Sequence, residues 1–244
     1  MFKGAVVFST AFFLICAKEI KVNYIKGKVE TVDSRLKGVN SISNLELGSS
    51  VSSHQIIATA KGSRTELTDD STLWRLGSLS VGRWFNNNDF WIHSGSILCS
   101  TQSSESFKIS STKSNAIFDG PGTFIIEATT NGGFKFIPLE TNGFITTTKG
   151  GTKQIKGGRM LLVLGSPTNF GDAYDIDLML MLKSSRLLNS FPQKLNRSQQ
   201  IEIALFVQQM KLRGKYDALI GDATSDKNLQ LWQFNKSNPE IKIK

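Results

Sequence analysis

Few residues in the sequence could carry out covalent or metal chemistry. Histidine occurs only as His54 and His93, and neither has an acid or a nucleophile at a diagnostic spacing. Zinc sites and nucleophilic catalysis need several such groups that converge on one point. The chain also lacks the G-x-S-x-G, H-E-x-x-H and phosphate-loop motifs. We therefore expect no catalytic residue, no metal and no cofactor, and we interpret both histidines as strand-edge residues.

The remaining reactive side chains fit structural roles better. Cys99 lies in the apolar stretch GSILCST, which is typical of a buried and inert thiol. The adjacent acids Asp69 and Asp70 could act as an acid and base pair or bind calcium, but no partner ligand is marked. An Asp-Asp-Ser turn between two strands is the favoured interpretation, because such side chains bond their own backbone.

Basic residues gather in the stretch KGGTKQIKGGR, at Lys149, Lys153, Lys156 and Arg159. The surrounding window from residue 141 to residue 171 contains no acid. Such a basic hairpin could meet phosphates, a wall polymer or an anionic membrane. It has no interleaved aromatic residues to stack on bases, so no nucleic-acid binding is expected. A solvated hairpin is the favoured alternative.

Aromatic residues cluster at Trp84, Phe85, Phe90 and Trp91, around the polar run FNNND. Such a group could form a platform for sugars or for a protein partner. In an all-β domain, packing in the core and turns is an equally good interpretation.

The stretch IFDGPGTFII places Gly120, Pro121 and Gly122 between two runs of β-favouring residues. It lacks the lysine, the hydroxyl spacing and the following helix of a phosphate cradle. We interpret it as a structural turn, in which the glycines supply permissive dihedral angles and the proline a fixed one.

The N-terminus predicts export. Lys3 precedes an uncharged, mostly apolar run that ends at Ala17, followed by Lys18 and Glu19. This run is short for a membrane span but has the length and flanks of a secretory signal. We expect residues 1–17 to be a cleaved signal peptide and the protein to be periplasmic or otherwise extracytoplasmic. An N-terminal membrane or lipid anchor, the latter at Cys16, is the alternative.

The next part of the chain, residues 18–165, has an all-β pattern. Apolar and polar residues alternate over short runs, which are separated by breakers such as LGSS, TDDS and NGG. We expect roughly ten short strands, arranged as a sandwich, a barrel or a β-solenoid, because spacing alone does not choose among these.

The residue pattern changes beyond residue 165. We expect a helical extension over 166–222, which starts with the loop SPTNFGDAYD, and a polar C-terminal tail over 223–244. The segment NRSQQIEIALFVQQMKLRGK has the composition of a helix, with Asn196 or Ser198 as N-cap and Gly214 as stop. Its apolar residues cover more than one stripe, so we expect it to pack on two sides as a core helix.

Read in order, the strands and turns resemble the FecR-like domain of bacterial periplasmic regulators. The family pattern is matched at Gly48, Ile57, Thr59, Gly62, Ser63, Leu67, Asp69, Ser71 and Leu73. Similar strands follow in WIHSGSIL, FKISST and GPGTFIIE, whereas Asp70 stands where the family usually has a turn glycine. The resemblance implies a mainly β fold of stacked sheets in an exported setting, used for protein interaction. Only Met1 to Lys3 precede the apolar run, so the family's cytoplasmic sigma-factor-binding domain is not matched.

These observations predict an exported, non-enzymatic binding or scaffolding module of the cell envelope, with an envelope protein as partner. Signalling and transport are the processes to which such a module could be coupled. One alternative is a protein that binds wall polysaccharide or another polyanion through the aromatic cluster and the basic hairpin. A third is a hydrolase whose site residues cannot be assembled from the sequence.

Overall fold

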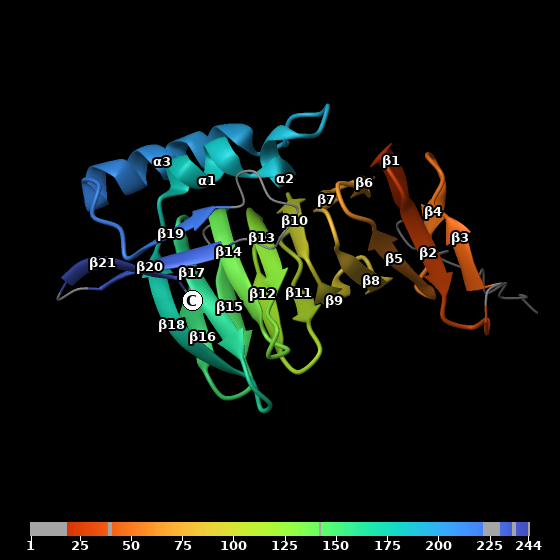
Figure 1. The fold of residues 1–244 in the computed structure, drawn as a ribbon, viewed down its shortest axis with the longest axis horizontal. Helices are drawn as coiled ribbons and strands as arrows, with labels where there is room; N and C mark the ends of the chain where they lie inside the picture. The colour runs from red at the N-terminus through yellow and green to blue at the C-terminus, as the bar shows by residue number, and fades with distance from the viewer. Residues whose placement is uncertain (1–18, 39–40, 142, 222–229, 236–237, 244) are drawn as a thin grey trace, which may run out of the picture.

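The computed structural model describes residues 19–38, 41–141, 143–221, 230–235 and 238–243, so the expected signal peptide lies outside it. Within these residues, two large β-sheets face each other and three helices cover one of them (Figure 1). Neither sheet closes into a barrel. The arrangement confirms a mainly β fold of stacked sheets with a C-terminal helical extension.

The first sheet, called sheet A, contains nine strands among the described residues. In spatial order these are β18 (Asn169–Asp175), β17 (Arg159–Leu164), β14 (Phe134–Thr141), β13 (Gly122–Ala128), β10 (Ser96–Thr101), β7 (Thr72–Leu76), β6 (Arg64–Thr68), β1 (Ile20–Lys26) and β4 (Ser50–Val51).

The second sheet, called sheet B, also has nine strands in this part of the chain. Their order is β16 (Gly151–Gln154), β15 (Phe144–Thr147), β12 (Asn115–Asp119), β11 (Phe107–Ser110), β9 (Asp89–Ser94), β8 (Val81–Asn86), β5 (Gln55–Thr59), β2 (Val29–Asp33) and β3 (Ile42–Asn44). The chain changes sheet after every one or two strands, so both sheets grow together along the long axis of the molecule (Figure 1).

The main core lies between the two sheets and is rich in aromatic side chains. Trp74 of β7 meets Phe90 of β9 edge to face, with ring centroids 4.6 Å apart. Phe118 and Phe124 make a similar pair across the sheets at 4.7 Å. All four side chains are buried. Burial of such large apolar surfaces is the main stabilising contribution to the sandwich.

A second core lies on the opposite face of sheet A, under α1 (Leu178–Ser184), α2 (Arg186–Asn189) and α3 (Ser198–Leu212). Ile125 and Ile137 of the sheet are fully buried there, together with Met181 of α1. Helix α1 begins at Asp177, whose carboxylate accepts a bond from the Leu180 amide at 3.0 Å. Sheet A is therefore the middle layer of three.

Several sequence expectations differ from the structure. The region expected to hold about ten strands contains β1–β17, because many strands have only two to five residues. The expected loop at the start of the extension contains β18, which pairs with β17 and extends sheet A. The expected break at residue 165 thus falls within a hairpin.

The expected polar tail also contains regular structure. Strands β20 (Gln230–Asn235) and β21 (Asn238–Ile243) form a three-stranded sheet with β19 (Ala218–Gly221). The alternation of apolar and polar residues in IKIK is a strand signal that the high polarity of the segment concealed.

Candidate functional site: the outer face of helix α3

Helix α3 carries two apolar stripes on opposite sides. At roughly 100° per residue, Ile201, Ala204 and Leu205 point to one side of the helix. The second stripe has the spacing i, i+3, i+4 and i+7 and lies about 180° away. It consists of Ile203, Phe206, Val207 and Met210.

The first stripe, called the inner stripe, faces sheet A. Ile201 is buried, and Ala204 and Leu205 pack against the second core. Gln208 on the same side is also buried and makes three hydrogen bonds. Its amide nitrogen donates to the carbonyls of Ile176 (2.8 Å) and Gly158 (3.3 Å), and its oxygen accepts from the Leu178 amide (3.2 Å). These bonds fix the rotation of α3 about its own axis.

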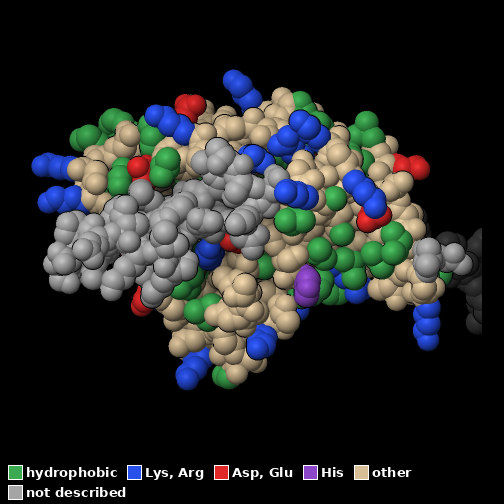
Figure 2. Space-filling view, viewed as in Figure 1, with side chains coloured by type: hydrophobic (Ala, Val, Ile, Leu, Met, Phe, Trp, Pro, Cys, Tyr) green, Lys and Arg blue, Asp and Glu red, His purple; other side chains and the backbone are tan. Residues whose placement is uncertain are grey.

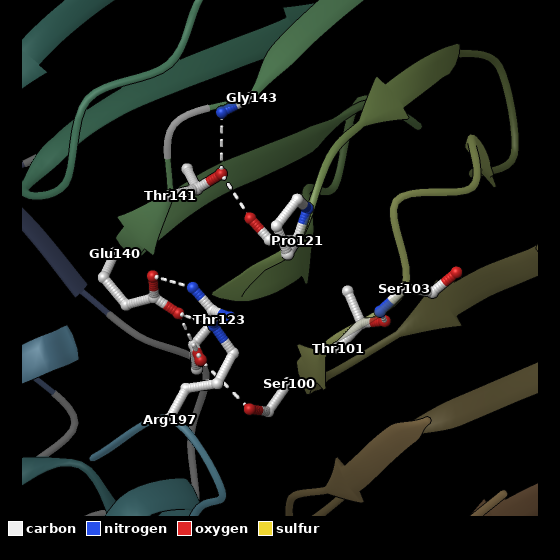
Figure 3. Close-up of polar contacts among 9 residues, drawn as sticks. All are labelled: Ser100, Thr101, Ser103, Pro121, Thr123, Glu140, Thr141, Gly143 and Arg197. Atoms are coloured by element: carbon white, nitrogen blue, oxygen red, sulfur yellow. Dashed lines mark hydrogen bonds and ion pairs between the residues drawn. The ribbon is translucent and has the colours of Figure 1, made fainter. Parts of the chain in front are cut away.

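The start of α3 is held by an ion pair. Arg197, the N-cap residue, donates to both carboxylate oxygens of Glu140 in β14, at 2.5 and 2.8 Å (Figure 3). Glu140 also accepts from Thr123 at 3.0 Å, and the Thr123 hydroxyl lies 3.0 Å from that of Ser100. The bond with Glu140 raises the pKa of Arg197. The N-cap is thus neither Asn196 nor Ser198, and the Arg197 side chain makes no capping hydrogen bond.

A buried arginine, Arg75, joins sheet A to the segment before α3. Arg75 of β7 donates to Glu66 of β6 at 2.8 Å, and both side chains are almost completely buried. The same guanidinium donates to the carbonyls of Leu187 (3.0 Å) and Gln193, and lies 4.5 Å from the Phe191 ring centre. Burial lowers the pKa of Arg75. The helical layer is thus attached to the sheet at several points.

The second stripe, called the outer stripe, is exposed. The exposed fractions are 57% for Ile203, 64% for Phe206, 40% for Val207 and 65% for Met210. Figure 2 shows hydrophobic side chains along the upper margin over α3, with Lys and Arg side chains beside them. The expectation that α3 packs on two sides is therefore wrong for the described residues. A contiguous exposed apolar stripe is typical of an interaction surface.

A groove of about 520 Å³ runs beside the outer stripe, between α3 and the segment that connects β16 to β17. Ile203, Ala204 and Val207 form its apolar wall on the helix. Ile155 and Gly157 line it on the side of the sandwich. The groove and the outer stripe therefore share Ile203 and Val207 and form one continuous surface, called the α3 surface below.

The charge of the α3 surface is positive. Its two acids are already paired, Glu140 with Arg197 and Asp175 with Arg159 at 2.7 Å. Lys156 and Lys211 line the groove, are exposed, and have no ion pair within the described residues. The surface thus offers an apolar strip with two available ammonium groups at its border.

The predicted aromatic platform does not form as one surface. Trp84 and Phe90 are buried in the main core, because their positions in β8 and β9 point toward sheet A. Phe85 is exposed, with the Arg83 guanidinium 4.6 Å from its ring centre. Trp91 is partly exposed, with its ring centre 5.4 Å from that of His93. Trp84 and Phe90 are therefore core residues rather than binding residues.

The predicted basic hairpin is divided in the structure. Lys149 and Lys153 are exposed on sheet B, where the Lys153 ammonium lies 4.7 Å from the ring centre of Phe170 in β18. Arg159 is engaged by Asp175, whereas Lys156 lines the groove. Of these four residues, Lys156 alone lines the α3 surface without an ion-pair partner among the described side chains.

The glycine-proline-glycine stretch connects β12 of sheet B to β13 of sheet A, and its two glycines have different roles. Gly120 has φ +115°, a conformation that other residues rarely adopt. Gly122 already belongs to β13, and a Cβ there would lie 2.7 Å from the Cβ of Thr141. Gly122 is therefore needed for space rather than for its dihedral angle. Thr141 in turn donates to the carbonyl of Pro121 at 2.9 Å (Figure 3).

The remaining chemistry-bearing residues occupy structural or isolated positions. Asp69 accepts from the amides of Ser71 and Thr72, each at 2.8 Å, which confirms the predicted turn. Cys99 is buried, and burial raises the pKa of its thiol. The described residues hold no group of three or more His, Cys, Asp or Glu side chains suited to a metal. No helix in them is long and apolar enough to cross a membrane.

The comparisons with known proteins add little to this description. No protein-family model matches the chain, and no curated protein does. Two crystal structures of a "putative anti-sigma factor" from Parabacteroides distasonis are similar at 11% identity and a TM-score of 0.41. Each alignment covers 74% of this chain and 99% of the other. A likeness at this level assigns no function to the chain.

Proposed function

We propose that this protein is an exported, non-catalytic FecR-like module that binds or scaffolds another protein in the cell envelope, with a link to signalling or transport. The FecR-like series of strand and turn motifs and the secretory pattern before residue 18 support this proposal. The observation that carries it is the exposed outer stripe of α3 on a helix that is otherwise firmly attached.

A rigidly held apolar surface is well suited to binding. Arg197, Gln208 and the inner stripe attach α3 to sheet A, so the outer stripe needs little ordering when a partner arrives. Less ordering leaves more of the interaction energy as affinity. Phe206 and Met210 are the most exposed residues of the outer stripe. Large apolar side chains of this kind frequently dominate binding energies.

Site-specific photo-cross-linking in the native cell tests this function. A photoreactive phenylalanine analogue replaces Phe206 in one strain and Phe144 in another. Phe144 is a matched control, because it is 47% exposed and belongs to sheet B. We expect one adduct of defined mass at position 206, in the envelope fraction and on chains that lack residues 1–17. Identical adducts at both positions, or none at 206, would contradict the proposal.

A further inference from the structure

We propose that the α3 surface binds a partner helix that presents an apolar stripe flanked by acidic residues. This inference rests on the proposed function and specifies the chemistry of the partner. The outer stripe follows the i, i+3, i+4 and i+7 pattern, and the groove runs beside it. Two helices that face each other along such stripes interdigitate their side chains.

Charge selects the flanks of this partner. The two acids that line the groove already form ion pairs with Arg197 and Arg159. Lys156 and Lys211 have no ion-pair partner among the described residues. Carboxylates placed beside a partner's apolar stripe would reach these two ammonium groups. Complementary charges at the rim of an interface fix its orientation and speed association.

The same charges disfavour a second copy of this chain as the occupant. Between residues 198 and 215, α3 and its C-terminal flank carry Lys211, Arg213 and Lys215 against one acid, Glu202. A symmetric dimer through α3 would bring these positive groups to the same interface. Like charges in that position are repulsive. A partner with acidic flanks avoids this repulsion.

Three synthetic peptides of about 18 residues, long enough to form a helix, serve as probes. The first has Leu at i, i+3, i+4 and i+7 with Glu on both flanks. The second keeps the Leu stripe and has Lys flanks, and the third keeps the Glu flanks and has Ser in place of Leu. Binding of each fluorescent peptide to the purified protein is followed by anisotropy at low and high salt.

We expect the first peptide to bind at least about tenfold more tightly than the other two, and added salt to weaken it. Phe206→Ser should lower its affinity about tenfold or more. The double change Lys156→Glu and Lys211→Glu should reverse the preference toward the peptide with Lys flanks. Lys61→Glu, an exposed charge change between β5 and β6, is the control and should leave binding unchanged.

Several results would overturn the inference. Equal binding of the first two peptides would show that charge does not select the partner. A dimer in light scattering that Phe206→Ser abolishes would identify a second copy as the occupant. A fall in melting temperature with Phe206→Ser would show that the stripe is already covered within the chain. A cross-link at position 206 without binding of any peptide would leave the proposed function standing and reject the acidic helix.

Discussion

The outer faces of the two sheets differ in what covers them. On sheet A, α1, α2 and α3 bury the face, and strands such as β10 and β13 are buried on both sides. On sheet B, the exposed large apolar residues are spread over four strands, with Ile42 in β3, Phe85 in β8, Ile117 in β12 and Phe144 in β15. Isolated exposed apolar residues are ordinary in soluble proteins, whereas a contiguous stripe is not. The comparison therefore favours α3 over sheet B as the proposed binding surface.

Substitutions in ion pairs should show the largest difference in stability between the two sheets. Arg75→Met removes the cation from a fully buried pair and leaves Glu66 charged without its partner. We expect a loss of about 3–5 kcal/mol in the free energy of unfolding, measured by chemical denaturation. The control is Lys108→Ala on sheet B, because Lys108 is exposed and its pair with Asp89 should contribute about 0–1 kcal/mol. Similar losses in both variants would contradict the difference.

Two isoleucines make a matched comparison of packing. Ile137 on sheet A is fully buried under the helices, whereas Ile117 on sheet B is 44% exposed. Truncation of a buried isoleucine leaves a cavity, so Ile137→Ala should lower the free energy of unfolding by about 2–5 kcal/mol. Ile117→Ala should change stability by less than about 0.5 kcal/mol. Equal losses in urea titrations would mean that sheet B is also covered.

A smaller effect is expected where α3 meets sheet A. Gln208→Ala leaves the Gly158 and Ile176 carbonyls and the Leu178 amide without their side-chain partner. We expect the free energy of unfolding to fall by about 1–3 kcal/mol. Hydrogen exchange should become faster in α3 and stay unchanged in sheet B. Faster exchange throughout the protein would instead show that α3 does not open separately from the sandwich.

The smallest effect on stability concerns the partly exposed carboxylate of Asp33 in β2 of sheet B. Arg35 donates to Asp33 and lowers its pKa to about 2. Because the folded pKa is lower than the unfolded value, the contribution to stability is present above about pH 4 and is lost as pH falls toward 2. Arg35→Ala removes the side-chain bonds but keeps the amide of residue 35 as a donor to Asp33. It should therefore raise the midpoint of the Asp33 titration, followed by NMR, part of the way from about 2 toward about 3.9. An unchanged midpoint would show that Arg35 is not the cause.

The sequence predicts the fold class well because local patterns encode it. Alternation in strands such as β11, and turn residues such as Asp69 and Gly120, are short-range signals. The length of β18 and the pairing of β9 with β11 depend on contacts between distant segments, so the sequence alone does not reveal them.

The site is harder to predict, because periodicity shows which residues are apolar but not which side of a helix is covered. Trp84 and Phe85 are adjacent aromatic residues, yet one is buried and the other exposed. In α3, two opposite apolar stripes suggested burial on both sides. The signal that could have revealed the surface was the i, i+3, i+4 and i+7 spacing from Ile203 to Met210 beside Lys211.

Oxidation of methionine in the native cell and in the purified protein tests the central claim most directly. Met210 is 65% exposed, whereas Met160 and Met181 are fully buried and serve as internal controls. In purified protein, dilute peroxide should convert Met210 to the sulfoxide well before the other two. In cells with native expression, a partner seated on α3 should protect Met210 severalfold. Equal oxidation of Met210 in both settings would contradict the account.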